Sequence, residues 1–491
     1  MTATKAASIS SLSKKDDDDD HDEINGGGDD SPAATPCGVF CNLTNSIVGA
    51  GVISIPHAMA QGGFLPICGL LVLCAFITLY AMNTIVRLGS YHHVDSFEDL
   101  AQVAFGIKGY LAVCFFQLTF SFGANCSYLV VIADTIPVVI GRLWNMHFAR
   151  GEPVPSSHTP WYIVLLTDRA CCVELVVVCI LLPICIHRSF GSLEKFAGLS
   201  ILSVSFCSLV ILYKWLRSFT GSSSSSRSYD HDFVYDFIAI HPQGIFPALG
   251  SIAFAYVCQH QTYLVYNSMA STKCPRAFGR ISRLGVAFAA TLIFTLSVPG
   301  YCLFRSATRS DIFLNFTDLS DKLIQTCRLM TGLNMVLTYP QEFMVARHTL
   351  QSLLTHWRRT KKQQREVDVL FREQSKPFHV SHSDVRPADS TPLHVGLTLL
   401  LLGSTLLISM VDHHLGDITS LTGSFSAVAL TFVLPAACHL KLGVPSKLYS
   451  PWQDAVVPWC TIVFGTVVFF VSTSTSVYAI HMRVMNATAI P

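Results

Sequence analysis

Charged residues are scarce in this chain. Only 13% of its 491 residues are Asp, Glu, Lys or Arg, whereas 51% are hydrophobic, and the mean hydropathy is +0.46. Apolar content this high, clustered in runs, excludes a water-soluble globule and indicates a polytopic membrane protein that lies in a lipid bilayer. The net charge of +1, without a continuous basic face, excludes a nucleic-acid partner.

Motifs of hydrolytic enzymes and metal centres are also missing. There is no HExxH or GxSxG motif and no carboxylate pair at hydrolytic spacing in an apolar run, so we expect no enzyme activity. No CxxC pair is matched by a second pair or by spaced histidines, so we expect neither a zinc site nor a cofactor. Many of the 17 cysteines lie inside apolar runs and form no disulfide framework, although a bridge between Cys302 and Cys327 stays open.

The beginning of the chain lacks apolar runs. Residues 1–36 contain an aspartate run, Asp16–Asp20, and a glycine run, Gly26–Gly28. Such a segment cannot bury enough apolar surface to offset its ordering entropy, and it lacks the basic and apolar parts of a signal peptide. We therefore expect a disordered acidic tail, followed by a membrane domain over residues 37–483.

What the chain does contain is a series of long apolar stretches. A membrane-spanning helix needs about 20 apolar residues. About eleven stretches are long enough, near residues 37–60, 64–88, 110–141, 171–187, 197–217, 243–268, 283–305, 323–348, 391–411, 418–439 and 457–481. Residues 161–167 are too short to span the bilayer, and we assign them to a loop.

Basic residues between the spans indicate the orientation. They are densest in the predicted basic loop 352–390, which holds Arg358, Arg359, Lys361, Lys362 and Arg365. This bias favours a cytoplasmic amino terminus, despite four arginines in the opposite loops. With eleven spans, the sequons at Asn315 and Asn486 then lie in the lumen or outside the cell, where asparagine can be glycosylated.

The first span contains the sequence NSIVGAGVISIP, from Asn45 to Pro56. Two glycines and a proline favour a break in the middle of this helix, which would expose backbone amides for a carboxylate and carbonyls for a cation or an ammonium group. Close helix packing is the alternative explanation, because glycine and proline are common in membrane helices. The sixth span carries a second polar interruption, FAYVCQHQ from Phe254 to Gln261. Paired interruptions in corresponding spans of two inverted halves indicate a transporter substrate site.

Four segments resemble the amino acid/auxin permease family. They are FCNLTNSIVGAGVISIPHAMAQGGF (40–64), IAFAYVCQHQTYLVYNSM (252–269), LTYPQEF (337–343) and GSFSAVALTFVLPAACHLKL (423–442). Within this family the chain is most similar to the sodium-coupled neutral amino acid transporters of solute carrier family 38, over about residues 36–480. The resemblance implies an inverted five-plus-five repeat like that of the leucine transporter, with halves at 37–217 and 243–440 and an extra helix at 457–481.

The resemblance also implies where ligands bind. The substrate would lie between the broken first and sixth helices and contact two groups of residues, Gly49, Ala50 and Gly51 on one side and Phe254, Ala255 and Tyr256 on the other. A sodium ion would lie between the first and eighth helices, with ligands from Ser46, Asn45, Gly49 and Thr338. These residues supply oxygens without a formal negative charge. For Asn45, interhelical hydrogen bonding is the alternative role, and for Thr338 a bond to its own helix backbone.

Two ionisable residues lie inside predicted spans and are candidate proton sites. Glu342 in the eighth span indicates a pathway or a proton relay, or else a pair with Arg347. His260 in the sixth span would make transport pH-sensitive, because histidine is the side chain that can change its charge near neutral pH, unless it is a satisfied buried histidine. The wider family includes proton-coupled members, so the coupling ion stays open between Na⁺ and H⁺.

The sequence thus predicts a secondary active transporter of neutral L-amino acids, Na⁺-coupled, which alternates access between helices one and six. The alternatives are an H⁺-coupled transporter of a vacuole or lysosome and a non-transporting amino acid sensor. The membrane is the plasma membrane or a vacuolar or lysosomal membrane, and no protein partner is predicted. We expect Gly51→Leu to abolish uptake and to leave folding intact.

Overall fold

The computed structural model describes residues 35–149, 152–155, 158–186, 194–220, 239–269, 273–318, 320–372, 391–412, 414–443 and 455–488. Nearly all of these residues are helical, which confirms the all-α prediction. The described residues belong to one compact unit. The predicted acidic tail lies outside the described residues up to residue 34.

The first half of the chain runs from a broken helix to a long one near residue 220. Its elements are α1 (Pro36–Ile47), α2 (Gly51–Gly62), α3 (Phe64–His92), α4 (Phe97–Phe105), α5 (Ile107–Leu143), β1 (His147–Ala149), β2 (Glu152–Val154), α6 (Trp161–Thr167), α7 (Arg169–Val176), the π-helical segment η1 (Val177–Leu181), α8 (Leu182–Ile186) and α9 (Glu194–Thr220). The two strands form a small antiparallel hairpin in which Phe148 faces Pro153.

The second half also begins with a broken helix. Its elements are α11 (Pro242–Tyr256), α12 (Gln259–Asn267), α13 (Pro275–Phe304), the 3-10 turns η3 (Arg305–Ala307) and η4 (Ile312–Asn315), α14 (Lys322–Arg372), α15 (Thr391–Val411), α16 (Leu415–Thr422), the π-helical segments η5 (Gly423–Ala427) and η6 (Ala429–Val433), α17 (Leu434–Leu442) and the last helix α18 (Val457–Thr488). The π-helical segments continue the helices on either side of them. Residues Arg169–Ile186 (α7 to α8) and Leu415–Leu442 (α16 to α17) are therefore each one continuous helix.

Each of the eleven predicted spans corresponds to a helix or a broken helix. Among the described residues, eight helices are long and apolar enough to cross a membrane, and the pair α1 and α2 makes a ninth. The other two predicted spans correspond to the pair α11 and α12 and to the first part of α14. These two carry the polar residues from which the sequence predicted ion and proton sites, which lowers their hydropathy.

Two predicted loops contain structure. Residues 352–390 were expected to be a loop, but α14 continues through them as far as Arg372. The stretch 352–372 has no Gly or Pro and is rich in Arg, Lys, Gln and Leu, which favour helix. Residues 161–167, also assigned to a loop, form the short helix α6. Helix α4 was not predicted from the sequence, and Ser96 caps it by accepting a hydrogen bond from the Asp99 amide at 3.0 Å.

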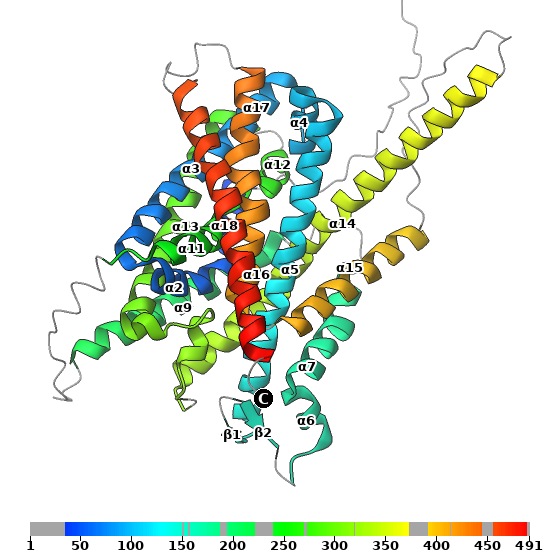
Figure 1. The fold of residues 1–491 in the computed structure, drawn as a ribbon. Coiled ribbons are helices and arrows are strands. Elements are labelled where there is room, and N and C mark those ends of the chain that lie inside the picture. Colours follow the sequence, from blue (N-terminus) through cyan, green and yellow to red (C-terminus); the bar gives the residue numbers. More distant parts are fainter. Residues whose placement is uncertain are drawn as a thin grey trace, which may run out of the picture. The chain divides into compact units, whose positions relative to one another are not determined.

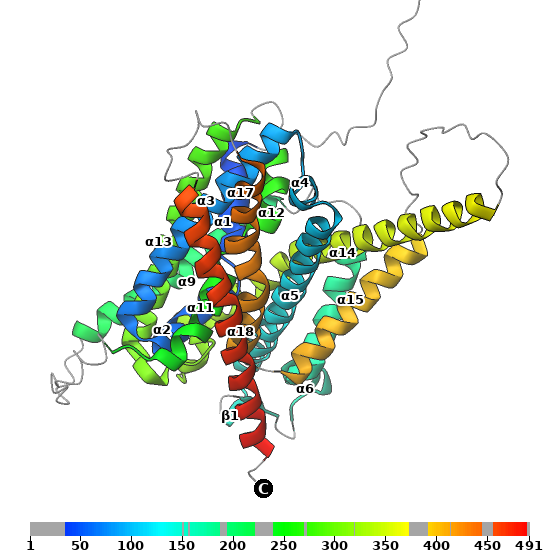
Figure 2. The same ribbon diagram turned by 45° about the horizontal axis from the view of Figure 1, so that its top comes forward.

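The long helix α5 packs along α14 and lies beside α15, whereas α2 packs against α11 and α13 (Figures 1 and 2). Helix α9 packs against both α13 and α14. Small residues allow close contacts between helices, as membrane packing requires. A Cβ placed on Gly123 would lie 2.2 Å from Thr422 Oγ1, and one on Gly250 would lie 2.3 Å from the Ser420 carbonyl oxygen.

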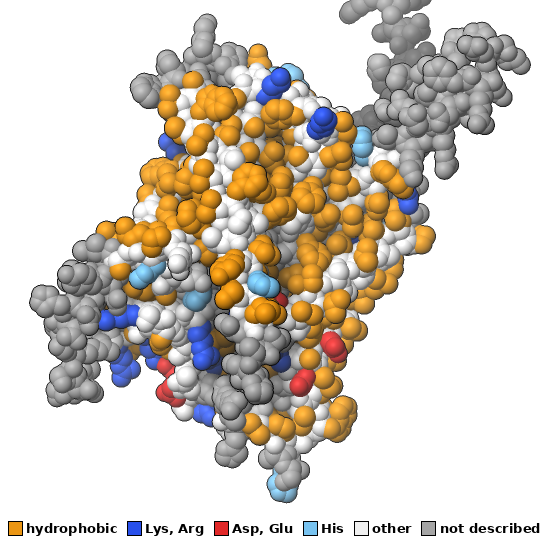
Figure 3. Space-filling model, in the orientation of Figure 1, with side chains coloured by type: hydrophobic (Ala, Val, Ile, Leu, Met, Phe, Trp, Pro, Cys, Tyr) orange, Lys and Arg blue, Asp and Glu red, His pale blue; other side chains and the backbone are white. Residues whose placement is uncertain are grey.

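The surface matches a lipid environment. Hydrophobic side chains dominate the face drawn in Figure 3, and Lys and Arg gather mainly near its ends. Large apolar side chains on several helices are exposed, among them Phe76, Leu202, Leu407 and Phe470. The interior is filled by other large side chains, including the fully buried Tyr256, Tyr339, Phe343 and Phe432.

The thiols of Cys302 and Cys327 are both free, so the possible bridge between them is not formed. Cys327 lies against α9, where its carbonyl accepts a hydrogen bond from Cys207 Sγ at 3.7 Å.

Candidate functional site

The first span is broken at Val48–Ala50. Helix α1 ends at Ile47, and Val48 has the non-helical dihedrals φ −93° and ψ 63° before α2 begins at Gly51. The two segments are bent by 43°. No side chain caps the first turn of α2, whose Val52 and Ile53 amides donate to the Gly49 and Ala50 carbonyls at 3.3 Å. The positive end of the α2 helix dipole points to the break. The predicted break is therefore present, six residues before Pro56, which lies inside α2.

The sixth span is broken at Val257 and Cys258, between α11 and α12. Side chains hold the backbone here. The Tyr256 carbonyl accepts a hydrogen bond from Thr78 Oγ1 at 3.4 Å, and the Cys258 amide donates to Gln259 Oε1 at 3.0 Å. The same Gln259 oxygen accepts a bond from Thr431 Oγ1 at 2.9 Å, which fixes the amide in place. The second predicted interruption is confirmed at this point.

The two broken helices touch each other directly. A Cβ on Gly51 would lie 2.8 Å from the Cα of Ala255 and 2.9 Å from Phe254 Cδ1. Of the predicted substrate residues, Gly51 therefore lies against Phe254 and Ala255. This closeness makes the expectation for Gly51→Leu wrong in one respect, because a side chain at Gly51 would push α2 away from α11 and disturb folding.

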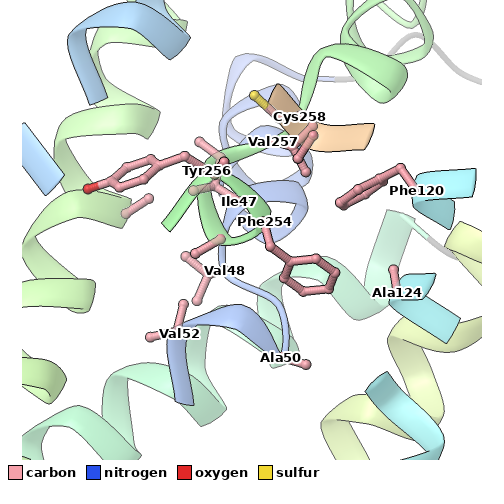
Figure 4. Close-up of a cluster of buried hydrophobic side chains, with 14 of the residues drawn as sticks. Ile47, Val48, Ala50, Val52, Phe120, Ala124, Phe254, Tyr256, Val257 and Cys258 are labelled. Carbon is pink, nitrogen blue, oxygen red and sulfur yellow. The ribbon is translucent and has the colours of Figure 1, made fainter. Parts of the chain in front are cut away.

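Figure 4 shows the aromatic side chains around the breaks. Phe254 points toward Phe120 and Ala124 of α5, whereas Tyr256 points to the opposite side. The ring centroids of Phe254 and Phe120 are 5.3 Å apart. Tyr128 of α5 lies next to the first break, since a Cβ on Gly49 would lie 3.2 Å from the Tyr128 hydroxyl. Of the predicted residues, Tyr256 is the one whose side chain lies away from this face.

Of the predicted cation ligands, Asn45 connects α1 to α14. Asn45 donates through Nδ2 to Gln341 Oε1 at 3.0 Å, while its Oδ1 and Ser46 Oγ are buried without a hydrogen-bond partner among the described residues. Thr338 Oγ1 donates to the Asn334 carbonyl at 2.8 Å, which leaves its lone pairs available. Asn45 is thus a link between helices, as the alternative role required, and it also keeps one oxygen for a ligand.

The packing of α5 on α14 shows how far along the helix bundle the polar residues of α14 lie. The two helices are antiparallel, because Ser121 contacts Glu342 and Thr135 lies against Gly332. Asn334 and Thr338 therefore lie at the level of Tyr128, which is also the level of Gly49. The break in the first span and the polar residues of α14 thus share one layer of the bundle.

The structure brings the two predicted proton residues together. His260 Nε2 lies 2.9 Å from Glu342 Oε1 and 3.1 Å from Oε2. Gln261 Nε2 donates to Oε1 at 2.6 Å and Ser121 Oγ to Oε2 at 3.1 Å. Both His260 and Glu342 are buried. Arg347, the other partner considered for Glu342, donates to the Cys185 carbonyl and, at 3.2 Å, to Thr398 Oγ1.

Several site residues were not found from the sequence. Phe120, Ser121 and Tyr128 belong to the third span, and Gln261 and Gln341 neighbour predicted residues. Ser121 and Glu342 are 221 residues apart in the sequence, so no local sequence pattern predicts their contact. A polar side chain within an apolar run can indicate a site residue. Ser121 is such a residue, but serine is common in membrane helices, so its presence indicates little.

A short segment between α13 and α14 packs against α2. The Thr308 carbonyl lies 2.7 Å from His57 Nδ1, and Asp311 and Ile312 are buried. Burial raises the pKa of the Asp311 carboxyl from 3.8 to about 7, and the negative charge of Asp134 adds to this shift. Asp311 accepts a hydrogen bond from the Phe313 amide through Oδ1, whereas Oδ2 has no partner among the described residues.

The predicted glycosylation sites have different surroundings. Asn315 ends η4, and its side chain holds the same segment together, since Nδ2 donates to the Ala307 carbonyl at 2.7 Å and Oδ1 accepts from the Arg309 amide at 2.8 Å. Asn486 lies within the last turns of α18. Glycosylation of both residues stays a prediction. Within the described part of the chain, no group of three or more His, Cys, Asp or Glu residues could hold a metal ion.

The fold is shared with solved membrane transporters. The manganese transporter of Eremococcus coleocola superimposes with a TM-score of 0.56 at 13% identity, over 90% of this chain and 86% of that one. MhsT, solved in complex with L-phenylalanine, has a TM-score of 0.55 at 11% identity, over 90% and 99% of the two chains. With its two broken helices, the chain is an all-α polytopic membrane protein with the leucine-transporter-like fold that the sequence predicted.

Proteins with related sequences show to which family of membrane proteins this chain belongs. The family model described as transmembrane amino acid transporter protein matches residues 33–478, so this chain belongs to that family. A mouse protein named "Putative sodium-coupled neutral amino acid transporter 11" is 26% identical over 430 residues, which is 88% of this chain and 82% of the mouse protein. The zebrafish protein of the same name is 28% identical, over 82% and 78% of the two chains. Vacuolar amino acid transporter 2 of Saccharomyces cerevisiae is 25% identical, over 89% and 82%.

These relatives confirm the resemblance to the sodium-coupled neutral amino acid transporters that the sequence motifs indicated. The chain is an amino acid transporter and not an enzyme.

Proposed function

We propose that this protein is a secondary active transporter that carries neutral amino acids together with Na⁺. The substrate lies at the two helix breaks, and access alternates between the two sides of the membrane. The observation that carries this proposal is the contact between the breaks, where Gly51 of α2 meets Ala255 of α11. Two interrupted helices in contact bring the backbone dipoles of both breaks close together.

The surroundings of the breaks favour a neutral side chain. The residues that form the two breaks, Val48–Ala50 and Val257–Cys258, carry no formal charge. Phe120, Phe254 and Tyr128 add aromatic surface. The positive end of α2 suits the substrate carboxylate, and among the described residues those that form the two breaks offer no charged group to pair with a charged substrate side chain.

Sodium coupling is supported by the oxygens between α1 and α14. Asn45 Oδ1 and Ser46 Oγ are buried and lack donors among the described residues, and Thr338 Oγ1 directs its proton to its own helix. Buried oxygens that have no donor favour a hard cation. Gly49 provides a carbonyl at the same level, although that carbonyl also accepts the Val52 amide at 3.3 Å.

A direct test is uptake of radiolabelled glutamine and other neutral amino acids into proteoliposomes under an inward Na⁺ gradient. We expect uptake to require Na⁺, and Thr338→Val to raise the Na⁺ concentration for half-maximal uptake about tenfold, equivalent to about 1.4 kcal/mol. Thr291→Val is the matched control, because Thr291 bonds to its own helix in the same way on an exposed face of α13. Equal Na⁺ dependence in wild type and Thr338→Val would refute the cation site.

A second candidate is an H⁺-coupled transporter of a vacuolar or lysosomal membrane. It is favoured by the buried pair of His260 and Glu342 and by the similarity to the yeast vacuolar transporter. The same proteoliposomes under an inward H⁺ gradient without Na⁺ distinguish the two candidates. Uptake that depends on H⁺ alone would replace Na⁺ as the coupling ion and leave the amino acid site unchanged. Fluorescent tagging of the full chain then identifies the membrane.

A further inference from the structure

A row of polar side chains joins α9 to α14, away from the two helix breaks. Ser203 Oγ of α9 donates to the Met330 carbonyl of α14 at 3.1 Å. One turn further along α9, Cys207 Sγ lies 3.7 Å from the Cys327 carbonyl oxygen and 3.6 Å from Thr331 Oγ1. These five residues form the α9–α14 seam.

The α9–α14 seam contains two cysteines. The thiols of Cys207 and Cys327 are side-chain hydrogen-bond partners, and both are free. In a disulfide the two sulfurs are about 2.0 Å apart. Because the Cys207 sulfur already contacts the backbone of residue 327, side-chain rotation and a small approach of the helices bring the two sulfurs to this distance.

Other neighbouring cysteines of the described chain do not offer the same bond. Cys37 and Cys41 interact along one helix, α1, so a bond between them would join no second helix. Cys302 of α13 interacts electrostatically with Cys68 of α3, without a thiol hydrogen bond among the described contacts. Within the described residues, the pair in the α9–α14 seam is the one with thiols in hydrogen-bond contact across two helices.

Water reaches one end of the seam. Lys214 of α9 forms an ion pair with Asp321, which precedes α14, and their side chains are 22% and 18% exposed. Cys207 lies about two helical turns from Lys214 on α9. Cys207 and Cys327 themselves are buried, so an oxidant must be small and neutral to reach them from this end. Hydrogen peroxide has both properties.

Helix α9 connects the seam to the substrate region. It packs against α1, the first part of the broken first span, and also against α13 and α14. Ser208, next to Cys207, donates to the Leu292 carbonyl of α13 at 3.5 Å. Alternating access requires α1 to move relative to α14, and α9 contacts both helices. A covalent bond between α9 and α14 would therefore restrict this motion.

We propose that Cys207 and Cys327 form a reversible disulfide that ties α9 to α14 and stops transport. The effect on transport rests on the proposed amino acid transport, whereas formation of the bond does not. The protein with free thiols is the active form, and the oxidised protein is the locked form.

The oxidation consumes one hydrogen peroxide. One thiol loses its proton and attacks a peroxide oxygen, which cleaves the O–O bond, gives a sulfenic acid and releases one water. The sulfur of the second thiol then attacks the sulfenic sulfur and forms the S–S bond. The hydroxyl group leaves with the second thiol proton as another water. Two thiols and one peroxide thus give one disulfide and two waters, and a dithiol reductant reverses the reaction.

The test uses the full-length chain in proteoliposomes, with a protease site inserted between α9 and α11. After treatment with hydrogen peroxide, free thiols are blocked with N-ethylmaleimide and the chain is cleaved. On a gel without reductant, the two fragments stay joined only if a disulfide connects them. Counterflow of radiolabelled glutamine, without any gradient, is measured before oxidation, after it, and after dithiothreitol.

The variants are Cys207→Ala and Cys327→Ala. Cys438→Ala is the matched control, because Cys438 is a buried cysteine of α17 whose thiol has no hydrogen bond among the described residues. We expect joined fragments and at least a tenfold loss of counterflow in wild type and Cys438→Ala, both reversed by dithiothreitol. We expect separate fragments and counterflow within about twofold of the untreated level in Cys207→Ala and Cys327→Ala. If one of these two variants does not fold, the other decides.

Separate fragments in oxidised wild type, or joined fragments in both cysteine variants, would overturn the disulfide. Joined fragments in wild type with unchanged counterflow would overturn its effect on transport. Absence of counterflow in untreated wild type would overturn the proposed function and this effect with it, while the fragments would still show whether the bond forms.

Discussion

Gly51 on α2 and Ala255 on α11 are in backbone contact, with only 2.8 Å between the position of a Cβ on Gly51 and the Ala255 Cα. No side chain fits between the two broken helices at this point. Gly51, which was predicted from the sequence to bind substrate, is therefore also the residue that allows the two broken helices to come into contact.

The first prediction concerns this contact. Gly51→Ala is expected to destabilise the folded protein by about 1–3 kcal/mol through overpacking and to lower uptake at least tenfold. Thermal unfolding in detergent and counterflow in proteoliposomes measure the two effects. Gly69→Ala is the control, because a Cβ there meets nothing within 4 Å. Unfolding temperatures that agree between the two variants would contradict the contact.

The second prediction uses the hydroxyl of Tyr128. A Cβ on Gly49 would lie 3.2 Å from it, tighter than ordinary contact but within reach of a small shift. We expect Gly49→Ala to raise the KM for amino acid about threefold to tenfold, and Tyr128→Phe to relieve part of that loss in the double variant. A double-mutant cycle on KM measures the coupling. Fully additive effects would show that the two residues do not interact in the transporting protein.

The third prediction concerns the pH dependence of stability. The pKa of Asp311 is raised by burial to about 7, so the folded protein binds this proton more tightly than the unfolded chain does. Its contribution is therefore most favourable at low pH and is lost as pH rises from about 4 to about 7, by a few kcal/mol. Asp311→Asn should flatten the unfolding temperature between pH 5 and 8. Asp318→Asn, at an exposed position, should not.

The fourth prediction separates two roles of Asn315. Thr317→Ala removes the glycosylation sequon but keeps the amide, which bonds to Ala307 and Arg309, whereas Asn315→Gln removes both. Both variants should lose the same mobility shift on glycosidase digestion of protein from eukaryotic cells. Asn315→Gln should also unfold with about 1–2 kcal/mol less stability than Thr317→Ala. Equal stability of the two variants would show that the amide bonds do not hold the segment.

Much of the architecture could be predicted from the sequence. Apolar runs of sufficient length gave all eleven helical segments, because the bilayer requires every backbone group to bond within its own helix. Gly49 and Gly51, and the polar run from Phe254, marked both breaks, since glycine and clustered polar residues interrupt such runs. The boundary of α14 could not be predicted in this way, because its end is set by helix-forming polar residues outside the membrane and not by apolar length.

The sequence by itself determined that the protein is a membrane transporter with two broken helices, because hydropathy and breaks are local properties. Only the tertiary structure decided that Glu342 pairs with His260, that Asn45 bonds to Gln341, and that Gly51 lies against Ala255. The physical reason is that these contacts join residues far apart in the sequence, 82 positions for His260 and Glu342 and 296 for Asn45 and Gln341. Each contact also depends on how two helices are rotated about their axes, and packing sets that rotation. Which face of a helix meets which neighbour depends on all helices together, and one helix cannot specify it alone.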